Sequence, residues 1–295
     1  MATSFHLPYT PPFSFDKCLQ GLYRSPDEIL YQVSDARVFR ALRLDHQLVP
    51  FMICEQDAGL KVETDISLSE AQQHELSAYV QNWFDLEKDL LPFYALLKQN
   101  PKLIHLPDQL AGLRIIGIPD LFEAICWSII GQQINLTFAH KLKRRLVEIY
   151  GEQIDWRGHS LHLFPQPETL LELDEVYLHE KMQFSRSKLK YLKNVSESFV
   201  SGELSREKLL QIHEFEDRQK LLTSIKGIGI WSANYALMKA LNQPEAIPFG
   251  DTGLTQALFN LNIIEDRKDE AAIKSFFESM TGWEAYTVFY LWQSL

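Results

Sequence analysis

The sequence predicts an α+β fold, in which an antiparallel sheet with an accompanying helix precedes a region that is helical almost throughout. Apolar and polar residues alternate between residues 29 and 64, the period of strands with one solvated face. After residue 103, apolar residues recur at helical spacing. The 295 residues, 46% of them hydrophobic, also suffice for about two domains with sizeable cores.

The predicted strands cover residues 29–33, 38–44, 51–54 and 60–64. Between them lie the polar turns Ser34-Asp35, Asp45-His46 and Asp57-Ala58-Gly59, which are typical of antiparallel hairpins. A helix is expected over residues 70–90, because its apolar residues keep helical spacing until shortly before Pro92.

The helical region begins with one long pattern over residues 121–150, which Pro119-Asp120 precedes and Gly151 ends. Residues 159–164 are expected to form a short β-ribbon. Further helices are predicted at residues 186–200, 206–213, 218–224, 231–241, 252–261, 269–280 and 283–294.

Composition excludes several classes of protein. No apolar run approaches the ~20 residues that a membrane span requires. The N-terminus has no basic start and no apolar core, so no secretory signal is expected. Three widely spaced cysteines without a C-x-x-C pair argue against a disulfide framework, a zinc site and an iron–sulfur cluster, and favour reduced thiols in the cytoplasm. The net charge of −10 argues, taken alone, against a nucleic-acid partner.

The most informative segment is residues 222–241, where Gly227 and Gly229 flank Ile228 between two predicted helices. Glycines allow a tight turn, and the exposed amides at the start of the second helix suit a phosphate oxygen. A simple turn between two helices explains a lone Gly-x-Gly equally well. The context of this segment therefore matters.

That context is an Asp that follows at a defined distance. Twenty residues after Trp231, the turn Pro248-Phe-Gly-Asp251 precedes the predicted helix at 252–261. An Asp at such a position is ordinarily a helix N-cap, and that interpretation stays open for Asp251 considered alone.

The order of these motifs resembles the helix-hairpin-helix DNA glycosylase superfamily, and within it the alkylation-repair branch of type II DNA-3-methyladenine glycosylases. Residues 11–15, 112–117, 122–133 and 283–286 are similar to segments of that branch. The resemblance implies an N-terminal α+β domain at residues 1–103 and two all-α subdomains. One spans residues 121–243 with the hairpin, and the other joins residues 104–120 to 244–295, with the catalytic Asp.

The resemblance implies a hydrolase that flips a damaged nucleotide out of double-stranded DNA and excises an alkylated purine in base excision repair. Asp251 matches the catalytic carboxylate, which stabilises positive charge on the sugar, orients water, or both. Trp231, Tyr235 and Trp292 match a base pocket whose electron-rich rings suit a cationic base. Core packing remains the other interpretation of Trp231 and Tyr235.

Strand-cleaving members of the superfamily carry a lysine two positions beyond the second hairpin glycine, where this chain has Trp231. The resemblance therefore implies a monofunctional glycosylase without AP-lyase activity. Gln133 matches the side chain that fills the gap left by the flipped nucleotide, although a solvated helix-terminal Gln is the alternative. Lys226, Gly227 and Gly229 are the expected DNA contacts of the hairpin.

No cofactor is expected beyond a monovalent cation, which the resemblance places at the backbone carbonyls of Thr223, Ile225 and Ile228. Residues 124–147 and 221–244 contain no Asp or Glu, which favours a local phosphate-binding face on an acidic protein. The expected partner is double-stranded DNA with alkylated bases, with no membrane and no obligate protein partner. Two alternatives stay open: a non-catalytic helix-hairpin-helix DNA-binding module, and a glycosylase for deaminated or oxidised bases.

Overall fold

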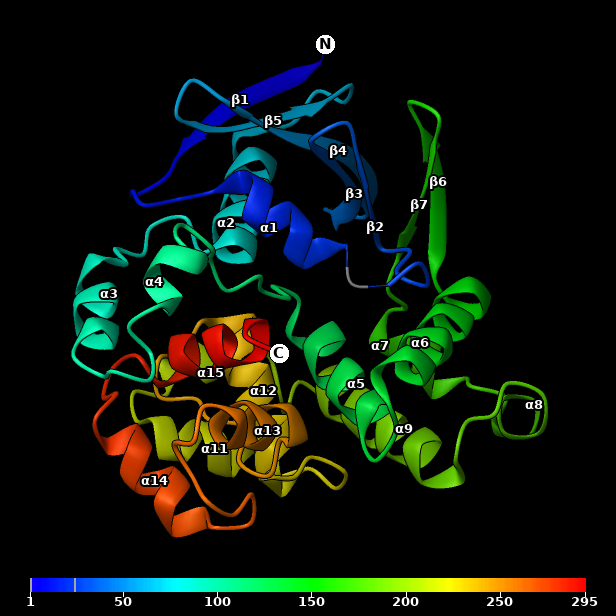
Figure 1. Cartoon of the computed structure of the whole chain (residues 1–295). Coiled ribbons are helices and arrows are strands. Elements are labelled where there is room, and N and C mark those ends of the chain that lie inside the picture. Colours follow the sequence, from blue (N-terminus) through cyan, green and yellow to red (C-terminus); the bar gives the residue numbers. More distant parts are fainter. Residues whose placement is uncertain (1, 24) are drawn as a thin grey trace.

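The computed structural model describes residues 2–23 and 25–295 (Figure 1). In the view of Figure 1 the N-terminal sheet lies above the helices, and the C-terminus lies in the middle of the helical part. Met1 and Arg24, which belong to the predicted domain at residues 1–103, lie outside the described residues. The predicted α+β fold is confirmed.

The sheet is antiparallel, with the strand order β1-β5-β4-β3-β2. Its strands are β1 (Thr3–Pro8), β2 (Tyr31–Ser34), β3 (Arg37–Leu44), β4 (Gln47–Gln56) and β5 (Gly59–Thr64). Consecutive strands from β2 to β5 are joined by two-residue turns whose residues all have positive φ: Asp35 and Ala36, Asp45 and His46, Asp57 and Ala58. Such turns match the right-handed twist of the flanking strands. The sequence predicted these turns, but it did not predict β1.

The helix predicted at residues 70–90 is wrong at its C-terminal end. Helix α2 (Glu70–Phe84) begins with a capping box of Ser69 and Gln72 and ends at Asp85, whose φ is 45°. The left-handed residue redirects the chain, and the remaining apolar residues, Leu86 and Leu90, lie between α2 and the next helix, α3 (Leu91–Lys98). Helix α1 (Phe15–Leu22), which the sequence analysis missed, lies with α2 beneath the sheet (Figure 1).

The single pattern predicted over residues 121–150 forms two helices, α5 (Leu121–Gly131) and α6 (Leu136–Tyr150). Asp120 caps α5 as predicted, but the side chain of Asn135 accepts the amide of Phe138 and starts a new helix. Gln133, with φ of 58°, turns the chain between the two helices. Continuous apolar spacing concealed this break.

The other elements follow in chain order. The ribbon consists of β6 (Glu152–Trp156) and β7 (His159–Leu163), and the helices are α4 (Leu106–Gln109), α7 (Pro167–Leu171), α8 (Glu175–Glu180), α9 (Arg186–Val200), α10 (Arg206–Gln211), α11 (Phe215–Ser224), α12 (Ile230–Leu241), α13 (Thr252–Asn260), α14 (Glu270–Glu278) and α15 (Glu284–Gln293). The later helices lie within a few residues of their predicted bounds, whereas α4, α7 and α8 were not predicted.

One hydrophobic core runs through the sheet and the helices without a break, from Leu7 in β1 to Leu291 in α15. A smaller cluster packs the β6–β7 ribbon against the sheet through Phe39, Met52 and Leu161. Burial of this apolar surface is the main stabilising contribution to the fold.

The segment before α5 lies among the C-terminal helices. The amide of Ile118 donates to the carbonyl of Lys239 in α12 at 2.6 Å, and the Tyr290 hydroxyl of α15 donates to the carbonyl of Leu113 at 2.9 Å. The contact with Tyr290 is compatible with the predicted grouping of residues 104–120 with residues 244–295, whereas Lys239 belongs to the predicted unit at residues 121–243. The domain boundaries themselves stay a prediction.

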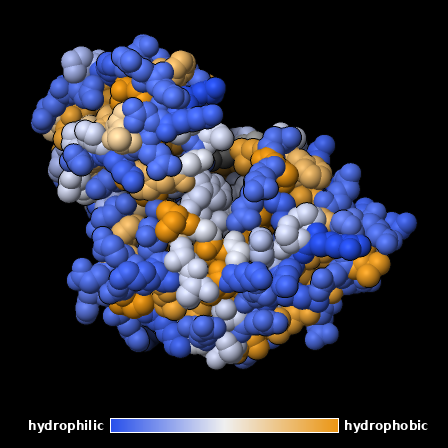
Figure 2. All heavy atoms as spheres, turned by 90° about the horizontal axis from the view of Figure 1, so that it is seen from below, coloured by the Kyte–Doolittle hydropathy of each residue, from blue (hydrophilic) through white to orange (hydrophobic). Residues whose placement is uncertain are grey.

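Among the helices of residues 2–23 and 25–295, none has the length and apolar character needed to cross a membrane. Figure 2 views the molecule from below and shows a hollow between two lobes. Hydrophobic and weakly hydrophilic residues gather in this hollow, while hydrophilic residues cover most of the surface around it.

Candidate active site

The hairpin, residues 225–229, joins α11 to α12 and is anchored from inside. Ile225 and Ile228 are 5% and 4% exposed, and the amide of Ile228 donates to the carbonyl of Ile225 at 3.1 Å. The side chain of Asn194, in α9, donates to the carbonyl of Lys226 at 3.0 Å, whereas the Lys226 side chain is exposed. The hairpin is therefore held by its apolar residues, and Lys226 stays at the surface.

The two hairpin glycines differ in their surroundings. Gly227 has φ of 112°, and a Cβ there would lie 2.5 Å from the ring of Tyr191, so no other residue fits without displacement. Gly229 is exposed, and a Cβ there would meet no heavy atom within 4 Å among the described residues. Gly227 is thus required by the fold, while Gly229 leaves space beside the N-terminus of α12.

Asp251 is the N-cap of α13 and is half-buried. Its Oδ1 accepts the amide of Leu254 at 2.7 Å and the indole N–H of Trp292 at 2.9 Å. Its Oδ2 accepts the indole N–H of Trp231 at 3.1 Å. The N-cap interpretation is therefore correct but incomplete, because two tryptophans also orient the carboxylate.

The three predicted pocket residues, Trp231, Tyr235 and Trp292, form one aromatic trio. The rings of Trp231 and Tyr235 stack with centroids 5.4 Å apart and an interplanar angle of 20°, and those of Tyr235 and Trp292 are 6.4 Å apart. All three are half-buried, which differs from the fully buried state of most core aromatics. The fold thus brings the trio and Asp251 together from α12, α13 and α15.

The electrostatics of this site are distinctive. Within the described residues, the hydrogen bonds to the Asp251 carboxylate come from neutral N–H donors, and no Lys or Arg forms an ion pair with it. Such donors fix the carboxylate without neutralising it. A carboxylate held in this way is placed to stabilise a positive charge that develops beside the aromatic trio, because the site is partly desolvated.

Gln133 is exposed in the break between α5 and α6, so the single helix predicted over residues 121–150 is wrong at this point, while the role of Gln133 stays a prediction. Its neighbour Gln132 ties this loop to the hairpin, because its side-chain amide donates to the carbonyl of Gly227 at 3.0 Å and to the hydroxyl of Ser232 at 3.1 Å. The Lys188 ammonium donates to the carbonyls of Ile129 and Gln132. Gln133 therefore has a fixed place beside the hairpin.

Several cations that the sequence analysis assigned to a phosphate-binding face are internal. Lys143 is buried and pairs with Glu28 and Glu123, and Lys239 is buried and donates to the carbonyl of Ile116. Burial also lowers the pKa of Lys188 below its usual range. Lys141 and Lys226 remain exposed. The face is less basic than the residue count suggested.

The carbonyls of Thr223, Ile225 and Ile228, predicted to hold a monovalent cation, lie at the end of α11 and within the hairpin. Carbonyl oxygens have two lone pairs, so the hydrogen bond that Ile225 accepts leaves capacity for a cation. Among the described residues, no group of His, Cys, Asp and Glu side chains has the arrangement of a metal site.

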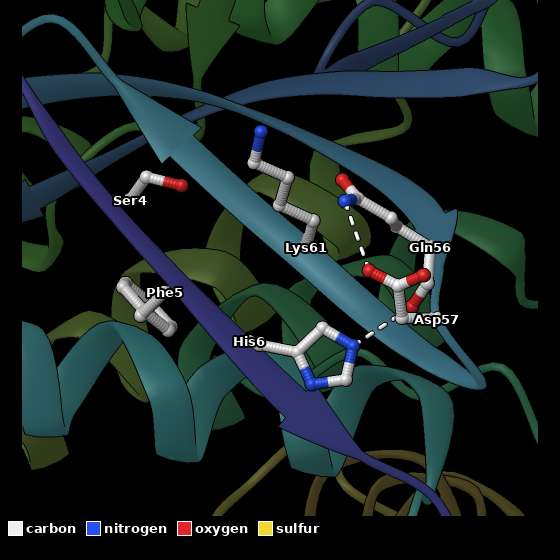
Figure 3. A pocket seen from close by; sticks show the side chains of 6 residues that line it. All are labelled: Ser4, Phe5, His6, Gln56, Asp57 and Lys61. Atoms are coloured by element: carbon white, nitrogen blue, oxygen red, sulfur yellow. Dashed lines mark hydrogen bonds between the residues drawn. The ribbon is translucent and has the colours of Figure 1, made fainter.

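A shallow pocket of about 350 Å³ lies on the sheet, where Ser4, Phe5, His6, Gln56, Asp57 and Lys61 line it (Figure 3). Two of its polar groups have partners: the His6 ring is within 2.8 Å of the carbonyl of Gln56, and Lys61 pairs with Glu63. The pocket has no aromatic trio, and the carboxylate of Asp57 in its lining accepts a hydrogen bond from the side-chain amide of the neighbouring Gln56.

Sequence reasoning missed Trp127 and Gln132, both on or next to α5. The indole N–H of Trp127 donates to the hydroxyl of Tyr235 at 3.0 Å, across 108 residues of chain. The signal in the sequence is a single Trp in a mostly apolar helix, four residues after Glu123 and therefore on the same face.

Comparison with known proteins identifies the family of the chain. The family model of the HhH-GPD superfamily of base excision DNA repair proteins matches residues 126–281, and that of the AlkA N-terminal domain matches residues 4–120. The chain is 40% identical over 287 residues to a DNA-3-methyladenine glycosylase of Bacillus subtilis (strain 168). The aligned region covers 96% of this chain and 94% of that relative.

Solved structures share the fold. A 3-methyladenine DNA-glycosylase from Archaeoglobus fulgidus aligns with a TM-score of 0.82 at 22% identity, covering 99% of this chain and 97% of that one. An 8-oxoguanine glycosylase/lyase from Clostridium acetobutylicum, in complex with double-stranded DNA, aligns with a TM-score of 0.73 at 19% identity, covering 95% and 90%. The two solved proteins have different named activities, so the shared fold alone does not select the substrate.

Proposed function

The chain belongs to the HhH-GPD superfamily of base excision DNA repair proteins, and we propose that it is a monofunctional DNA glycosylase that releases alkylated purines by hydrolysis. The observation that supports this most strongly is the Asp251 carboxylate, fixed by the indoles of Trp231 and Trp292 beside an aromatic trio. A curated relative with the matching name is 40% identical over nearly the whole chain.

The reaction follows from this geometry. The damaged nucleotide leaves the DNA stack, and its base enters the space beside Trp231, Tyr235 and Trp292. An alkylated purine with a positive charge leaves as a neutral base when the bond from C1′ to the base nitrogen breaks, so no general acid is needed. Asp251 stabilises the positive charge left on the sugar and orients the water that adds its oxygen to C1′. The water's second proton passes to solvent, and the products are a free base and an abasic site.

The aromatic trio supplies selectivity for charged bases. Stacking of a cation on an electron-rich ring contributes ~0.5–2 kcal/mol more than stacking of a neutral base. Trp231 occupies the position at which strand-cleaving relatives carry a lysine, so this chain has no amine there to form a Schiff base. The proposed enzyme leaves the DNA strand intact.

The hairpin and the neighbouring loop supply the proposed DNA contacts. Gly229 is the N-cap of α12 and has open space beside it, so its amide can donate to a phosphate oxygen. Lys226 adds a positive charge in the same hairpin, and Gly227 maintains the turn. Gln133 fills the gap that the flipped nucleotide leaves. The carbonyls of Thr223, Ile225 and Ile228 hold a monovalent cation, which would supply positive charge near the phosphate.

We further propose the division into residues 1–103, 121–243, and 104–120 with 244–295, and action in the cytoplasm on double-stranded DNA without an obligate protein partner. The acidic net charge is compatible with this, because hairpin amides donate to phosphate without adding charge. Binding to undamaged DNA should accordingly be weak and should fall as salt rises.

The test is to incubate the protein with DNA that carries methylated purines and to identify the bases released by chromatography, with strand integrity monitored on a gel. Release of 3-methyladenine or 7-methylguanine with intact strands is the expected result. DNA binding without release of any base would indicate a non-catalytic module. Release of only deaminated or oxidised bases would replace the proposed substrate class.

A further inference from the structure

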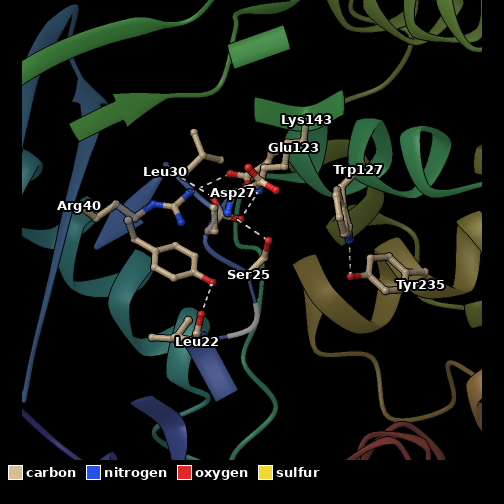
Figure 4. Close-up of polar contacts among 11 residues, drawn as sticks. Leu22, Ser25, Asp27, Leu30, Arg40, Glu123, Trp127, Lys143 and Tyr235 are labelled. Carbon is tan, nitrogen blue, oxygen red and sulfur yellow. Dashed lines mark hydrogen bonds and ion pairs between the residues drawn. The ribbon is translucent and has the colours of Figure 1, made fainter. Parts of the chain in front are cut away.

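Trp127 contacts the aromatic trio from the opposite helix. It lies in α5, is half-buried, and donates its indole N–H to the Tyr235 hydroxyl at 3.0 Å (Figure 4). An indole has a single N–H donor, so this bond uses the whole polar capacity of the Trp127 side chain. The Tyr235 ring is thereby held at its hydroxyl end by Trp127 and on its face by Trp231, which stacks on it at 5.4 Å.

Trp127 is itself held by a buried charge cluster, which consists of Glu28, Arg40, Glu123 and Lys143. The Lys143 ammonium lies 5.4 Å from the centre of the Trp127 ring. It also lies 2.8 Å from a carboxylate oxygen of Glu28 and 3.4 Å from one of Glu123. Both carboxylates fix the ammonium, and the ammonium in turn packs on the indole.

The cluster joins Trp127 to the N-terminal sheet. Arg40, in β3, donates to Glu123 of α5 at 2.8 Å (Figure 4). Its guanidinium also lies over the ring of Trp83, 4.9 Å from the ring centre. Glu28 comes from the segment between α1 and β2. A continuous set of contacts therefore runs from the sheet through Glu123 and Lys143 to Trp127, and from Trp127 to Tyr235.

We propose that Trp127 is a positioning residue for base excision, which fixes the Tyr235 ring in the orientation that receives the flipped base. This inference rests on the proposed function of the aromatic trio. Trp127 acts through Tyr235 and need not touch the substrate. A ring that is already fixed loses less conformational freedom when a base stacks on it, so its orientation contributes to the rate of the bound complex more than to the affinity for DNA.

The test is a double-mutant cycle of W127F and Y235F, which remove the donor and the acceptor of the same hydrogen bond and keep both rings. The readout is the single-turnover rate of 7-methylguanine release at saturating protein, with the Kd for DNA measured separately. Each single variant should lower the rate about fivefold, which corresponds to one neutral hydrogen bond of ~1 kcal/mol. The double variant should be lowered by about the same factor, and the Kd should not change.

The matched control is W156F. Trp156, in the β6 strand, donates its indole N–H to Asp65 at 2.7 Å, so this variant loses the same kind of bond in the ribbon and should retain the wild-type rate. A wild-type rate for W127F, or independent effects that multiply to about 25-fold in the double variant, would overturn the role of Trp127. Should W127F fail to fold, Y235F alone still tests the hydrogen bond. A wild-type rate for Y235F would show that the Tyr235 hydroxyl, which accepts this bond, does not contribute to the reaction, and it would overturn the proposal.

These results separate two kinds of failure. No base release by the wild-type protein from any damaged DNA would overturn the proposed function itself. Release by the wild type, combined with independent effects of W127F and Y235F, would overturn only the positioning role.

Discussion

Two regions of the molecule hold carboxylates in opposite ways. In the buried charge cluster, Glu28 and Glu123 are nearly inaccessible and pair with Lys143 and Arg40. In the candidate active site, Asp251 is half-buried and receives only neutral N–H groups from Trp231, Trp292 and the backbone. The first arrangement satisfies its negative charges permanently, whereas the second leaves one available.

The difference shows what a fold must provide for a carboxylate that stabilises the structure and for one that acts on a substrate. A buried carboxylate is tolerated when its desolvation cost is offset by a fixed cation and hydrogen bonds. Burial alone would raise the pKa of Glu28, but the adjacent Lys143 ammonium and the amide of Leu30 outweigh it and hold that pKa below its usual range. A carboxylate that stabilises a transient cation on a substrate needs fixed geometry without such a permanent partner, which the indole donors of Asp251 provide.

The largest expected effect is that of Asp251→Asn. The side chain keeps its size and its capping oxygen, but one of the two tryptophans would then face an amide NH₂ instead of an oxygen. The single-turnover rate of base release should fall about 10³-fold, while the free energy of unfolding stays within ~1 kcal/mol of wild type. Asp120→Asn is the matched control, because Asp120 caps α5 in the same manner. Substantial turnover by the Asp251 variant would show that the two regions do not differ in function.

Lys143→Met tests the other region. Loss of the ammonium leaves the buried Glu28 carboxylate without its cation, although Arg40 still pairs with Glu123. The free energy of unfolding in urea should fall by about 3 kcal/mol. Lys141→Met, at an exposed position on the same helix, should change it by less than ~0.5 kcal/mol. Equal stability of the two variants would mean that the cluster contributes little.

A smaller effect is expected for Trp292→Leu. This variant tests whether the site of Asp251, which has no cationic partner within the described residues, selects positively charged bases. The variant loses the bond to Asp251 for every substrate, but it loses the cation–π contribution only for charged bases. The ratio of 7-methylguanine release to hypoxanthine release should therefore fall about fivefold. An unchanged ratio would contradict selectivity through ring charge.

The smallest effect concerns pH. Because the pKa of Glu28 is lowered in the folded protein, its pairing stabilises the fold above the usual glutamate range, and this contribution is lost as the pH falls through the folded-state value. The difference in unfolding free energy between wild type and Glu28→Gln should thus be largest near pH 7 and shrink towards pH 3.5. A difference that grows on acidification would contradict the ion pairing.

The sequence predicted the features that depend on local pattern. The hairpin turns at Asp35, Asp45 and Asp57 and the helix start at Asp120 follow from residues within a few positions of one another. The end of α2 at Asp85 and the break at residues 132–135 did not, because apolar spacing continues across both. A left-handed Asp or Gln carries little signal compared with a glycine.

For the candidate site, the residues brought together were predictable where a motif specified them. Asp251, Trp231, Tyr235 and Trp292 came from the resemblance, and the structure assembles them. Trp127 and the buried charge cluster were not predictable, because three of their hydrogen bonds between side chains join residues 83 to 115 positions apart in the chain, whereas that between Lys143 and Glu123 spans 20. The basic character of residues 124–147 was overestimated for the same reason, since sequence alone does not show that Lys143 faces a buried Glu28.

The unbroken hydrophobic core has a consequence for how the chain unfolds. Leu7, Phe15 and Val38 from the N-terminal part share one packed cluster with Leu237, Val288 and Leu291 from the helices, so heat or urea should melt both parts in a single cooperative transition. A chain shortened to begin at residue 121 would expose the apolar side chains that this interface now covers. Removal of the sheet is therefore expected to destabilise the helical part.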